Sequence, residues 1–228
     1  MRLIGTLMIL GVSVLLFLPG IPWLAAAVTS PHSPAAPEAM TREPAPGMFL
    51  VARRKLNDPH FKKTVIFILR HDKEGTLGLI VNRPGRIRLS DVVSGIKRSH
   101  PYRLYFGGPV EPSLITLLLK STQEIPQAEH ITGDVYFSAN RHVLDRLLAE
   151  KLPENQLHFF LGHAGWTAGQ LASELRREDW FVLNRDAKTI FSSDIGTLWQ
   201  RLIEKLEPTG ILVKSGIPGD HRTWLSVS

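Results

Sequence analysis

An uninterrupted apolar run at residues 65–69 constrains the fold of this chain more than any other sequence feature. A polar turn, residues 71–75, separates this run from a second apolar segment at residues 76–82. A short run of β-branched and bulky apolar residues is typical of a strand that is buried on both faces. Two such runs joined by a polar turn predict a β-hairpin inside the hydrophobic core.

Other segments of the chain follow the periods of strands and helices. We expect strands at residues 48–52, 64–69, 76–82, 104–106, 115–119, 134–138, 157–161 and 180–183 and helices at 90–96, 141–151, 167–177 and 193–206. Strands outnumber helices, and several neighbouring strands are linked as hairpins, so the chain does not follow the strict alternation of a doubly wound sheet. The pattern predicts a single α+β domain over residues 48–207, with a mixed sheet flanked by three or four helices.

The segment before this domain has the composition of a targeting sequence. Arg2 precedes an apolar stretch at residues 3–18, and small residues follow at 25–27. A charged start, an apolar middle and an Ala-x-Ala site are typical of a secretory signal peptide. An uncleaved membrane anchor is the alternative, because an apolar span extended to Val28 is long enough to cross a bilayer.

The predicted organisation therefore has four parts. They are a signal peptide or membrane anchor at 1–28, a Pro/Ala-rich linker at 29–47, the α+β domain at 48–207 and an irregular C-terminal tail at 208–228. Five prolines lie between residues 29 and 47, which favours an extended linker over a packed element. If translation starts at Met40 or Met48, the leader is not made and the protein stays in the cytoplasm.

Basic residues are concentrated in the first third of the predicted domain. Residues 53–103 contain 13 Lys and Arg but 4 Asp and Glu, whereas residues 104–228 contain 12 and 15. This surplus predicts a face that binds anions, either nucleic-acid phosphates or acidic lipid head groups. The alternative is a solvated surface with charges on several sides. The candidates for an anion-binding face are Arg53, Arg54, Lys55, Lys62, Lys63, Arg86 and Arg88.

The sequence lacks the common catalytic and metal-binding signatures. It has no cysteine, which excludes thiol nucleophiles, thiolate metal sites and iron–sulfur clusters. It has no Gly-x-Ser-x-Gly, His-Glu-x-x-His or phosphate-loop motif. We therefore expect no catalytic, cofactor-binding or metal-binding residues.

A few residues still invite a chemical interpretation. Asp58 and His60 flank Pro59, but a turn role for Asp58 explains that position without catalysis. Gly107-Gly108-Pro109 is expected to form a backbone turn, and Glu111 after it could act as an acid or base, although the sequence supplies no partner. His158 and His163 are five residues apart along one strand, which would place them on opposite faces and make them unsuited to one metal ion.

Three segments together resemble the bacterial YqgE/AlgH family. The quoted residues are Asp58-Pro59-His60-Phe61 with Thr64-Val65 and Gly78 to Pro84, then Phe106 to Val110, then Gly162 to Trp166 with Gly169-Gln170-Leu171, Glu174 and Trp180. The resemblance implies a compact α+β domain with a partly barrel-like sheet. It brings no established enzymatic activity, and one family branch is associated with transcriptional control of alginate production.

The chain departs from the family pattern in three ways. His163 stands where a tyrosine is usual, and Thr167-Ala168 replaces a common Gly-Pro type pair. Family members generally begin near the equivalent of Met48 and look cytosolic, whereas this chain carries a leader. The leader therefore predicts a location at the bacterial inner membrane or in the periplasm, with residues 3–28 in the membrane if they are not cleaved.

The matched residues allow a structural and a functional interpretation. In the structural one, Gly165 and Gly169 permit a tight passage from strand to helix, and Trp166 fills the core with its indole N–H bonded to one acceptor. Asn82 bonds its own backbone and Pro84 stops the ladder. In the functional one, six residues line a ligand cleft in which Arg83 binds an anion. These are Asn82, Arg83, Gly107, Gly108, Gly165 and Trp166.

Three functions follow from these observations. The first is a non-enzymatic binding or regulatory domain of the YqgE/AlgH type, anchored in or exported across the inner membrane. The second is a cytosolic transcriptional regulator that contacts nucleic acid through the basic segment 53–103. The third is an unrecognised nucleotide-binding or hydrolytic enzyme that uses the Gly107-Gly108 turn.

Overall fold

The computed structural model describes residues 43–97, 101–184 and 186–208. The chain divides into two units, Met1–Ala36 and Pro37–Ser228, and every described residue belongs to the second. The predicted leader, most of the linker and almost all of the tail lie outside the described residues. Within the described ranges, no helix is both long and apolar enough to span a membrane.

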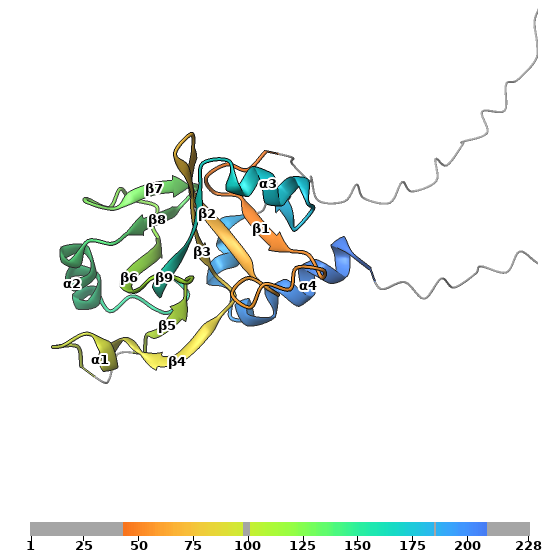
Figure 1. Cartoon of the computed structure of the whole chain (residues 1–228). Helices are drawn as coiled ribbons and strands as arrows, with labels where there is room; N and C mark the ends of the chain where they lie inside the picture. The colour runs from red at the N-terminus through yellow and green to blue at the C-terminus, as the bar shows by residue number, and fades with distance from the viewer. Residues whose placement is uncertain (1–42, 98–100, 185, 209–228) are drawn as a thin grey trace, which may run out of the picture. The chain divides into compact units, whose positions relative to one another are not determined.

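The described residues form ten strands and a smaller number of helices (Figure 1). The strands are β1 (Phe49–Ala52), β2 (Val65–Asp72), β3 (Gly75–Ile80), β4 (Pro84–Arg88), β5 (Arg103–Phe106), β6 (Val110–Lys120), β7 (Glu129–Thr132), β8 (Val135–Ser138), β9 (Leu157–Thr167) and β10 (Trp180–Leu183). The helices are α1 (Leu89–Val92), α2 (Arg141–Glu150), α3 (Gln170–Arg176) and α4 (Leu198–Leu206), with 3₁₀ turns η1 (Ala187–Phe191) and η2 (Ile195–Thr197).

All ten strands belong to one mixed, open sheet. The main order is β10-β1-β2-β3-β9-β6-β8-β7, and β5 joins β9 while β4 joins β5. The β5–β9 pair is parallel and the other pairs are antiparallel. β10 and β7 each have a single neighbour, so the sheet does not close into a barrel. The predicted α+β class is confirmed.

The predicted hairpin and its burial are confirmed. Val65 to Leu69 are at most 2% exposed, and β2 pairs antiparallel with β3 from Ile66 to the turn at Asp72–Gly75. The Asp72 carboxylate accepts the backbone N–H groups of Glu74 (2.8 Å) and Gly75 (3.2 Å) and closes the turn. Asp favours such turns because its short side chain can bond the backbone two residues on.

Two apolar clusters hold the sheet together. The larger joins β1, β2, β3 and β10 to η1 and α4, and the smaller packs the apolar face of α2 on β6 and β9. The α2 helix begins as predicted, with the Asn140 side chain accepting the His142 N–H at 2.8 Å. Its stripe of Val143, Leu144, Leu147 and Leu148 is buried.

Several elements differ from the sequence prediction, among them α4, which begins at Leu198 and not at 193, and β6, which begins at Val110 and not at 115. β9 continues to Thr167, past the expected end at 161, so the following helix α3 begins at Gln170. Gly169, with φ +74°, is its N-cap and makes the turn that we assigned in part to Gly165. The first helix, expected at 90–96, is the single turn α1, because Val93 is extended.

Two strands were not predicted from the sequence at all. β4 begins at Pro84, which we expected to end a strand. Because β4 is an edge strand that pairs with β5 alone, its first residue needs no N–H for the ladder. β7 is four residues long and mostly exposed, so it lacks the apolar alternation that identifies a strand.

Candidate functional site

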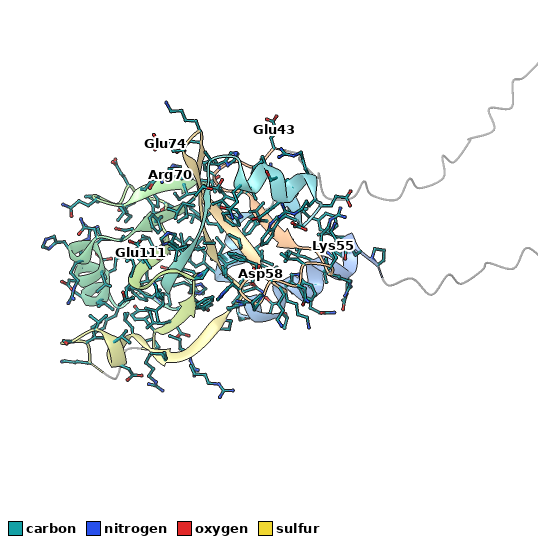
Figure 2. The ribbon with its side chains drawn as sticks, in the orientation of Figure 1. Glu43, Lys55, Asp58, Arg70, Glu74 and Glu111 are labelled. Carbon is teal, nitrogen blue, oxygen red and sulfur yellow. The ribbon has the colours of Figure 1, made fainter. Side chains whose placement is uncertain are left out.

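A loop between β1 and β2, Asn57–Thr64, is the centre of the candidate site, and we call it the basic loop. Asp58 begins its turn, because its carboxylate accepts the backbone N–H groups of His60 (2.7 Å) and Phe61 (3.1 Å). Figure 2 labels Asp58 in this loop, whereas Arg70 and Glu74 mark the hairpin tip at the other end of β2. The turn role predicted for Asp58 is confirmed.

Asn82 holds the end of the basic loop against the sheet. Its Oδ1 accepts the Val65 N–H at 2.7 Å, and its Nδ2 donates to the Lys63 carbonyl at 3.0 Å. Asn82 is buried, with 7% of its surface exposed. We expected its side chain to bond its own backbone, but it bonds a neighbouring segment of the chain. Lys63 has φ +59°, a conformation that a non-glycine residue adopts only at a cost of about 1–2 kcal/mol. The amide of Asn82 therefore stabilises a strained backbone.

Arg83 holds the middle of the same loop. Its two terminal nitrogens donate to the carbonyls of His60 (2.7 Å) and Lys62 (2.9 Å), and its guanidinium lies 5.8 Å from the Phe106 ring centroid. Burial lowers the pKa of Arg83, and the nearby Asp58 carboxylate opposes that shift. The guanidinium that we considered as an anion-binding group is thus used to shape the loop.

An aromatic cluster holds the loop from its other side. Phe61 stacks on Trp166 with 5.8 Å between ring centroids, and meets Trp180 edge-on at 5.9 Å. The two indoles are also edge-on to each other at 5.9 Å. Such offset and edge-to-face geometries are the favourable ones for aromatic rings.

One carboxylate joins the two indoles of this cluster. Glu174 Oε2, on α3, accepts the N–H groups of Trp166 (2.8 Å) and Trp180 (2.9 Å), and Gln170 donates to Glu174 Oε1 at 3.2 Å. The prediction that the Trp166 indole needs an acceptor is confirmed. The sequence did not show that one side chain satisfies both tryptophans, because the contact depends on how α3 packs on β9 and β10.

The loop presents cations that have few partners. The side chains of His60, Lys62 and Lys63 are exposed, and no carboxylate among the described residues forms an ion pair with either lysine. The Lys63 ammonium and the Arg54 guanidinium lie 5.9 and 6.0 Å from the Trp199 ring centroid. The basic loop is therefore a rigid, cationic surface.

The other predicted members of the basic face lie in different surroundings. Arg53 pairs with Glu178 at 3.3 Å and lies 4.0 Å from the Phe181 ring centroid, and Arg54 pairs with Glu207 at 3.7 Å. Lys55 donates to the Arg177 carbonyl at the end of α3. Arg86 and Arg88 are exposed on β4. The seven residues thus divide into three that tie elements together, two on the basic loop and two on β4.

Gly107 and Gly108 lie where two backbones approach closely. A Cβ at Gly108 would be 2.2 Å from the His163 carbonyl carbon, and one at Gly107 would be 2.3 Å from the Gly162 carbonyl oxygen. Gly107 also bonds Ile80 and Leu161 through its carbonyl and its N–H, each at 2.8 Å. These contacts place the turn beside β3 and β9 and account for both glycines without a ligand.

The structure brings only part of the predicted cleft together. The Arg83 carbonyl accepts the Phe106 N–H at 3.0 Å, which joins the Asn82-Arg83 segment to the Gly107-Gly108 turn. Gly165 and Trp166 lie on β9 opposite Leu77 and Thr76 of β3. Trp166 is 5% exposed, so like Asn82 it is a core residue that supports the loop.

Glu111 has a neighbour that the sequence did not supply. Its Oε2 is 3.7 Å from His163 Nδ1, and Glu111 has φ +47°. Burial lowers the pKa of His163, while the Glu111 charge raises it in part. The Glu111 side chain is 64% exposed, so this pair is open to solvent.

The remaining histidine of interest is buried in the sheet. His158 is 6% exposed, and burial lowers its pKa to about 4, against a smaller effect of a backbone hydrogen bond to Glu154. Its ring is stacked on Tyr105 at 4.6 Å. Within the described ranges, no three His, Asp or Glu residues gather into a group that could hold a metal ion.

Comparisons with known proteins place the described fold among bacterial relatives. A family model described as AlgH-like matches residues 49–209. A UPF0301 protein of Aliivibrio salmonicida is 32% identical over 179 residues, which cover 74% of this chain and 95% of the relative. A UPF0301 protein of Coxiella burnetii is 35% identical over 161 residues, covering 67% and 84%. These names state no activity.

Two solved structures have a similar fold. The solution structure of the AlgH protein from Pseudomonas aeruginosa is 27% identical, with a TM-score of 0.62, and covers 72% of this chain and 91% of its own. A crystal structure of a protein from Corynebacterium diphtheriae is 24% identical, with a TM-score of 0.59, and covers 72% and 87%. At that identity the second likeness concerns the fold alone.

Proposed function

This chain belongs to the AlgH-like family, a family of uncharacterised function, and on that premise we propose that it is a non-enzymatic binding domain whose basic loop holds an anionic partner. The resemblance to YqgE/AlgH proteins that the sequence predicts is thereby confirmed. The binding function is our proposal, and the arrangement of the residues around the loop supports it.

One observation carries this proposal. Residues on which the family resemblance rests contact the basic loop from two segments that are far apart in the sequence. Asn82 and Arg83 bond its backbone, and Trp166 packs on its one aromatic residue apart from His60, the partly buried Phe61. Because separate segments of the fold hold this one exposed loop in place, we infer that the shape of the loop matters for binding.

The charges on the loop indicate the kind of partner. The side chains of Lys62 and Lys63 form no ion pair with a carboxylate of the described residues, so their charges are available to a ligand. A loop that is already fixed loses little conformational entropy when it binds, which raises affinity for a given set of contacts. Phosphate-bearing surfaces are the natural partners of clustered lysines.

A binding experiment with a defined polyanion tests this proposal. Inorganic polyphosphate should bind the full chain in isothermal titration calorimetry, with an affinity that falls as salt rises. Each basic residue near an anionic surface contributes about 1 kcal/mol, so the double variant Lys62→Ala, Lys63→Gly should bind about 30-fold more weakly. Glycine is chosen at position 63 because it accepts the positive φ.

Lys73→Ala is the matched control for the loss of charge. Lys73 is exposed on the hairpin between β2 and β3, at the far end of β2 from the basic loop. The Lys73→Ala variant should bind polyphosphate with the same affinity as the unaltered chain. Equal affinities of the control and the double variant would contradict the proposal.

We also place the domain at the bacterial inner membrane or in the periplasm, directed there by residues 1–28. Support comes only from the charged, apolar and small-residue pattern of that segment. Cell fractionation with N-terminal sequencing of the mature protein tests the location. Recovery of a soluble form that begins at Met40 or Met48 would contradict it.

The Glu111–His163 pair favours a second candidate function, a hydrolytic or nucleotide-processing enzyme. At 3.7 Å the Glu111 carboxylate is beyond hydrogen-bond distance of the His163 imidazole, and a small approach of its exposed side chain would let it orient the ring for general acid–base chemistry. A screen for phosphatase and nucleotidase activity addresses this candidate. Turnover that disappears in Glu111→Gln would favour the enzyme, and its absence in the unaltered chain would favour the binding domain.

A further inference from the structure

We propose that β4 and α1 together form a second contact surface, which docks on an anionic lipid bilayer. We call residues Pro84–Val92, with the neighbouring Arg103 of β5, the β4–α1 tip. This inference rests on the proposed function and deepens it, because it names a lipid surface as the source of the anionic partner. It is carried by exposed aliphatic side chains, by unpaired arginines and by the place of β4 in the sheet.

The tip exposes large aliphatic side chains. Among the described residues, the large hydrophobics that are exposed are Ile87 (48%), Val92 (46%) and Val110 (39%). Two of these three belong to the tip and are five positions apart, whereas the neighbouring Leu89 and Val93 are buried in the smaller core cluster. Two exposed aliphatic residues within one short segment that also carries arginines are consistent with a contact with an apolar phase.

The same segment carries more cations than anions, since its one carboxylate, Asp91, accepts the Arg88 backbone N–H and pairs with no arginine side chain in the described residues. Arg86, Arg88 and Arg103 are exposed, and none of them forms an ion pair with a carboxylate of the described residues. Arg88 and Arg103 are register partners in the β4–β5 pair. Like charges directly opposite each other destabilise a sheet, and a layer of anions would remove that repulsion.

The position of the tip makes it accessible to a flat partner. β4 pairs with β5 alone, outside the main path of the sheet, and Figure 1 shows β4 and α1 along one border of the described domain. Such a border can contact a flat bilayer more easily than a concave surface can. Arginine guanidinium groups would then lie among the head groups, with the aliphatic groups just below them.

A peptide strand added to the edge of β4 is the less favourable occupant. β4 starts with a proline, which cannot donate to a ladder, and its register with β5 shifts between Pro84 and Arg88. The Arg88 N–H already donates to the Asp91 carboxylate at 3.1 Å. These features protect the edge against strand addition.

Nucleic acid is also less favourable than a lipid surface. Proteins that bind single strands stack bases on exposed aromatic rings, and the tip has none among its own residues. Ile87 and Val92 would gain nothing from phosphates, whereas insertion at the head-group boundary removes their apolar surface from water. The combination of arginine and aliphatic residues therefore favours the bilayer.

The absence of cysteine from the chain allows a site-specific test. We would label Val92→Cys in the full chain with a nitrobenzoxadiazole fluorophore. The label reports the polarity around position 92 alone, so binding of vesicles by the amino-terminal segment does not by itself change the signal. Val110→Cys, at the third exposed aliphatic residue, is the matched control. Vesicles of phosphatidylcholine with 30% phosphatidylglycerol, and vesicles of phosphatidylcholine alone, are the probes.

We expect a blue shift and a rise of emission at position 92 with the anionic vesicles, and no change with the neutral ones or at position 110. Arg86→Glu with Arg88→Glu should weaken the response by 30-fold or more, because removing two basic residues alone costs about that factor. A label at position 92 that stays in water while the chain sediments with anionic vesicles would overturn the inference. So would equal responses at positions 92 and 110.

The outcomes also separate this inference from the proposed function. If polyphosphate binding depends on Lys62 and Lys63 but position 92 stays in water, the bilayer surface is wrong and the basic loop stands. If position 92 inserts but polyphosphate does not bind, the loop function is wrong and the tip stands. A duplex oligonucleotide that binds the tip and prevents the vesicle response at equal phosphate concentration would favour nucleic acid over lipid.

Discussion

Two aromatic clusters lie along β9 and differ in how their buried polar atoms are paired. Near the end of the strand, Trp166 packs with Phe61 and Trp180, and Glu174 accepts both indole N–H groups. Near its start, His158 stacks on Tyr105 and lies against Phe191, at 4.6 and 5.2 Å between centroids. There, His158 Nδ1 and Thr116 Oγ1 are buried without a hydrogen-bond partner among the described residues.

The difference shows what each cluster contributes. A buried polar network in which every member is satisfied fixes one geometry, and this network positions the basic loop. An unpaired buried polar atom costs about 1–3 kcal/mol and fixes nothing. We therefore expect changes in the first cluster to cost stability and binding together, and changes in the second to affect stability alone.

Removing the shared acceptor should have the largest effect. Glu174→Leu leaves two buried indole N–H groups unpaired, so we expect the free energy of unfolding to fall by about 2–5 kcal/mol. Glu174→Gln keeps an acceptor oxygen, so its free energy of unfolding should fall by less than that of Glu174→Leu. Urea unfolding of the three proteins measures this, and a Leu variant as stable as the Gln variant would show that the pairing is unimportant.

The second cluster should make stability depend on pH. The folded-state pKa of His158 is about 4 and its ordinary value is 6.5, because burial disfavours the imidazolium. Between these pH values His158 is protonated in the unfolded chain but not in the folded one. The contribution of the neutral His158 to the free energy of unfolding is therefore fully present above pH 6.5 and is lost as the pH falls towards 4. A shift of this size corresponds to a loss of about 3 kcal/mol.

Unfolding at several pH values tests this expectation. His158→Phe keeps a ring that can stack on Tyr105 and removes the titration, so its stability should fall less between pH 6.5 and pH 4. An identical decline in both proteins would assign the pH dependence to other groups.

Asn82 extends the paired network to the backbone of the basic loop. Asn82→Ala leaves the buried Val65 N–H without its acceptor, so we expect a loss of about 2 kcal/mol in the free energy of unfolding. Amide hydrogen exchange should become faster at Val65, while the amides of α2 exchange at a rate that reflects only the global change. Unchanged exchange at Val65 would contradict the role of Asn82.

The smallest effect has the opposite sign. Thr116 is 2% exposed and its hydroxyl has no partner in the described part of the chain, so Thr116→Val removes a buried polar atom at almost constant volume. We expect stabilisation by about 1 kcal/mol with unchanged polyphosphate affinity. Thermal unfolding measures the first quantity, and a destabilised variant would show that the hydroxyl is paired in solution.

The sequence predicted the local features of the fold well. The hairpin after Val65, the amphipathic α2 and the turn at Asp58 each depend on neighbouring residues, and each is found as predicted. The need of Trp166 for an acceptor followed from the chemistry of indole. β4 was missed because Pro84 and Gly85 usually interrupt strands, and its place at the edge of the sheet is a tertiary property.

The candidate site was predictable only in its parts. Arg83 was identified, but the functional interpretation gave its cation to a ligand, whereas in the structure it bonds two carbonyls of the basic loop. Glu174 was part of the family resemblance, yet its joint contact with Trp166 and Trp180 depends on the packing of α3. Such convergence comes from long-range contacts, which sequence spacing does not encode.

In the proposed function, the shape of the basic loop, and not only its charge, holds the anionic partner. The affinity of Asn82→Ala for polyphosphate, measured at a temperature where the variant is fully folded, tests this most directly because every cation is retained. We expect an affinity about tenfold lower, because about 1.4 kcal/mol of ordering free energy must now be supplied on binding. An affinity equal to that of the unaltered chain would show that charge alone is sufficient and would contradict the account.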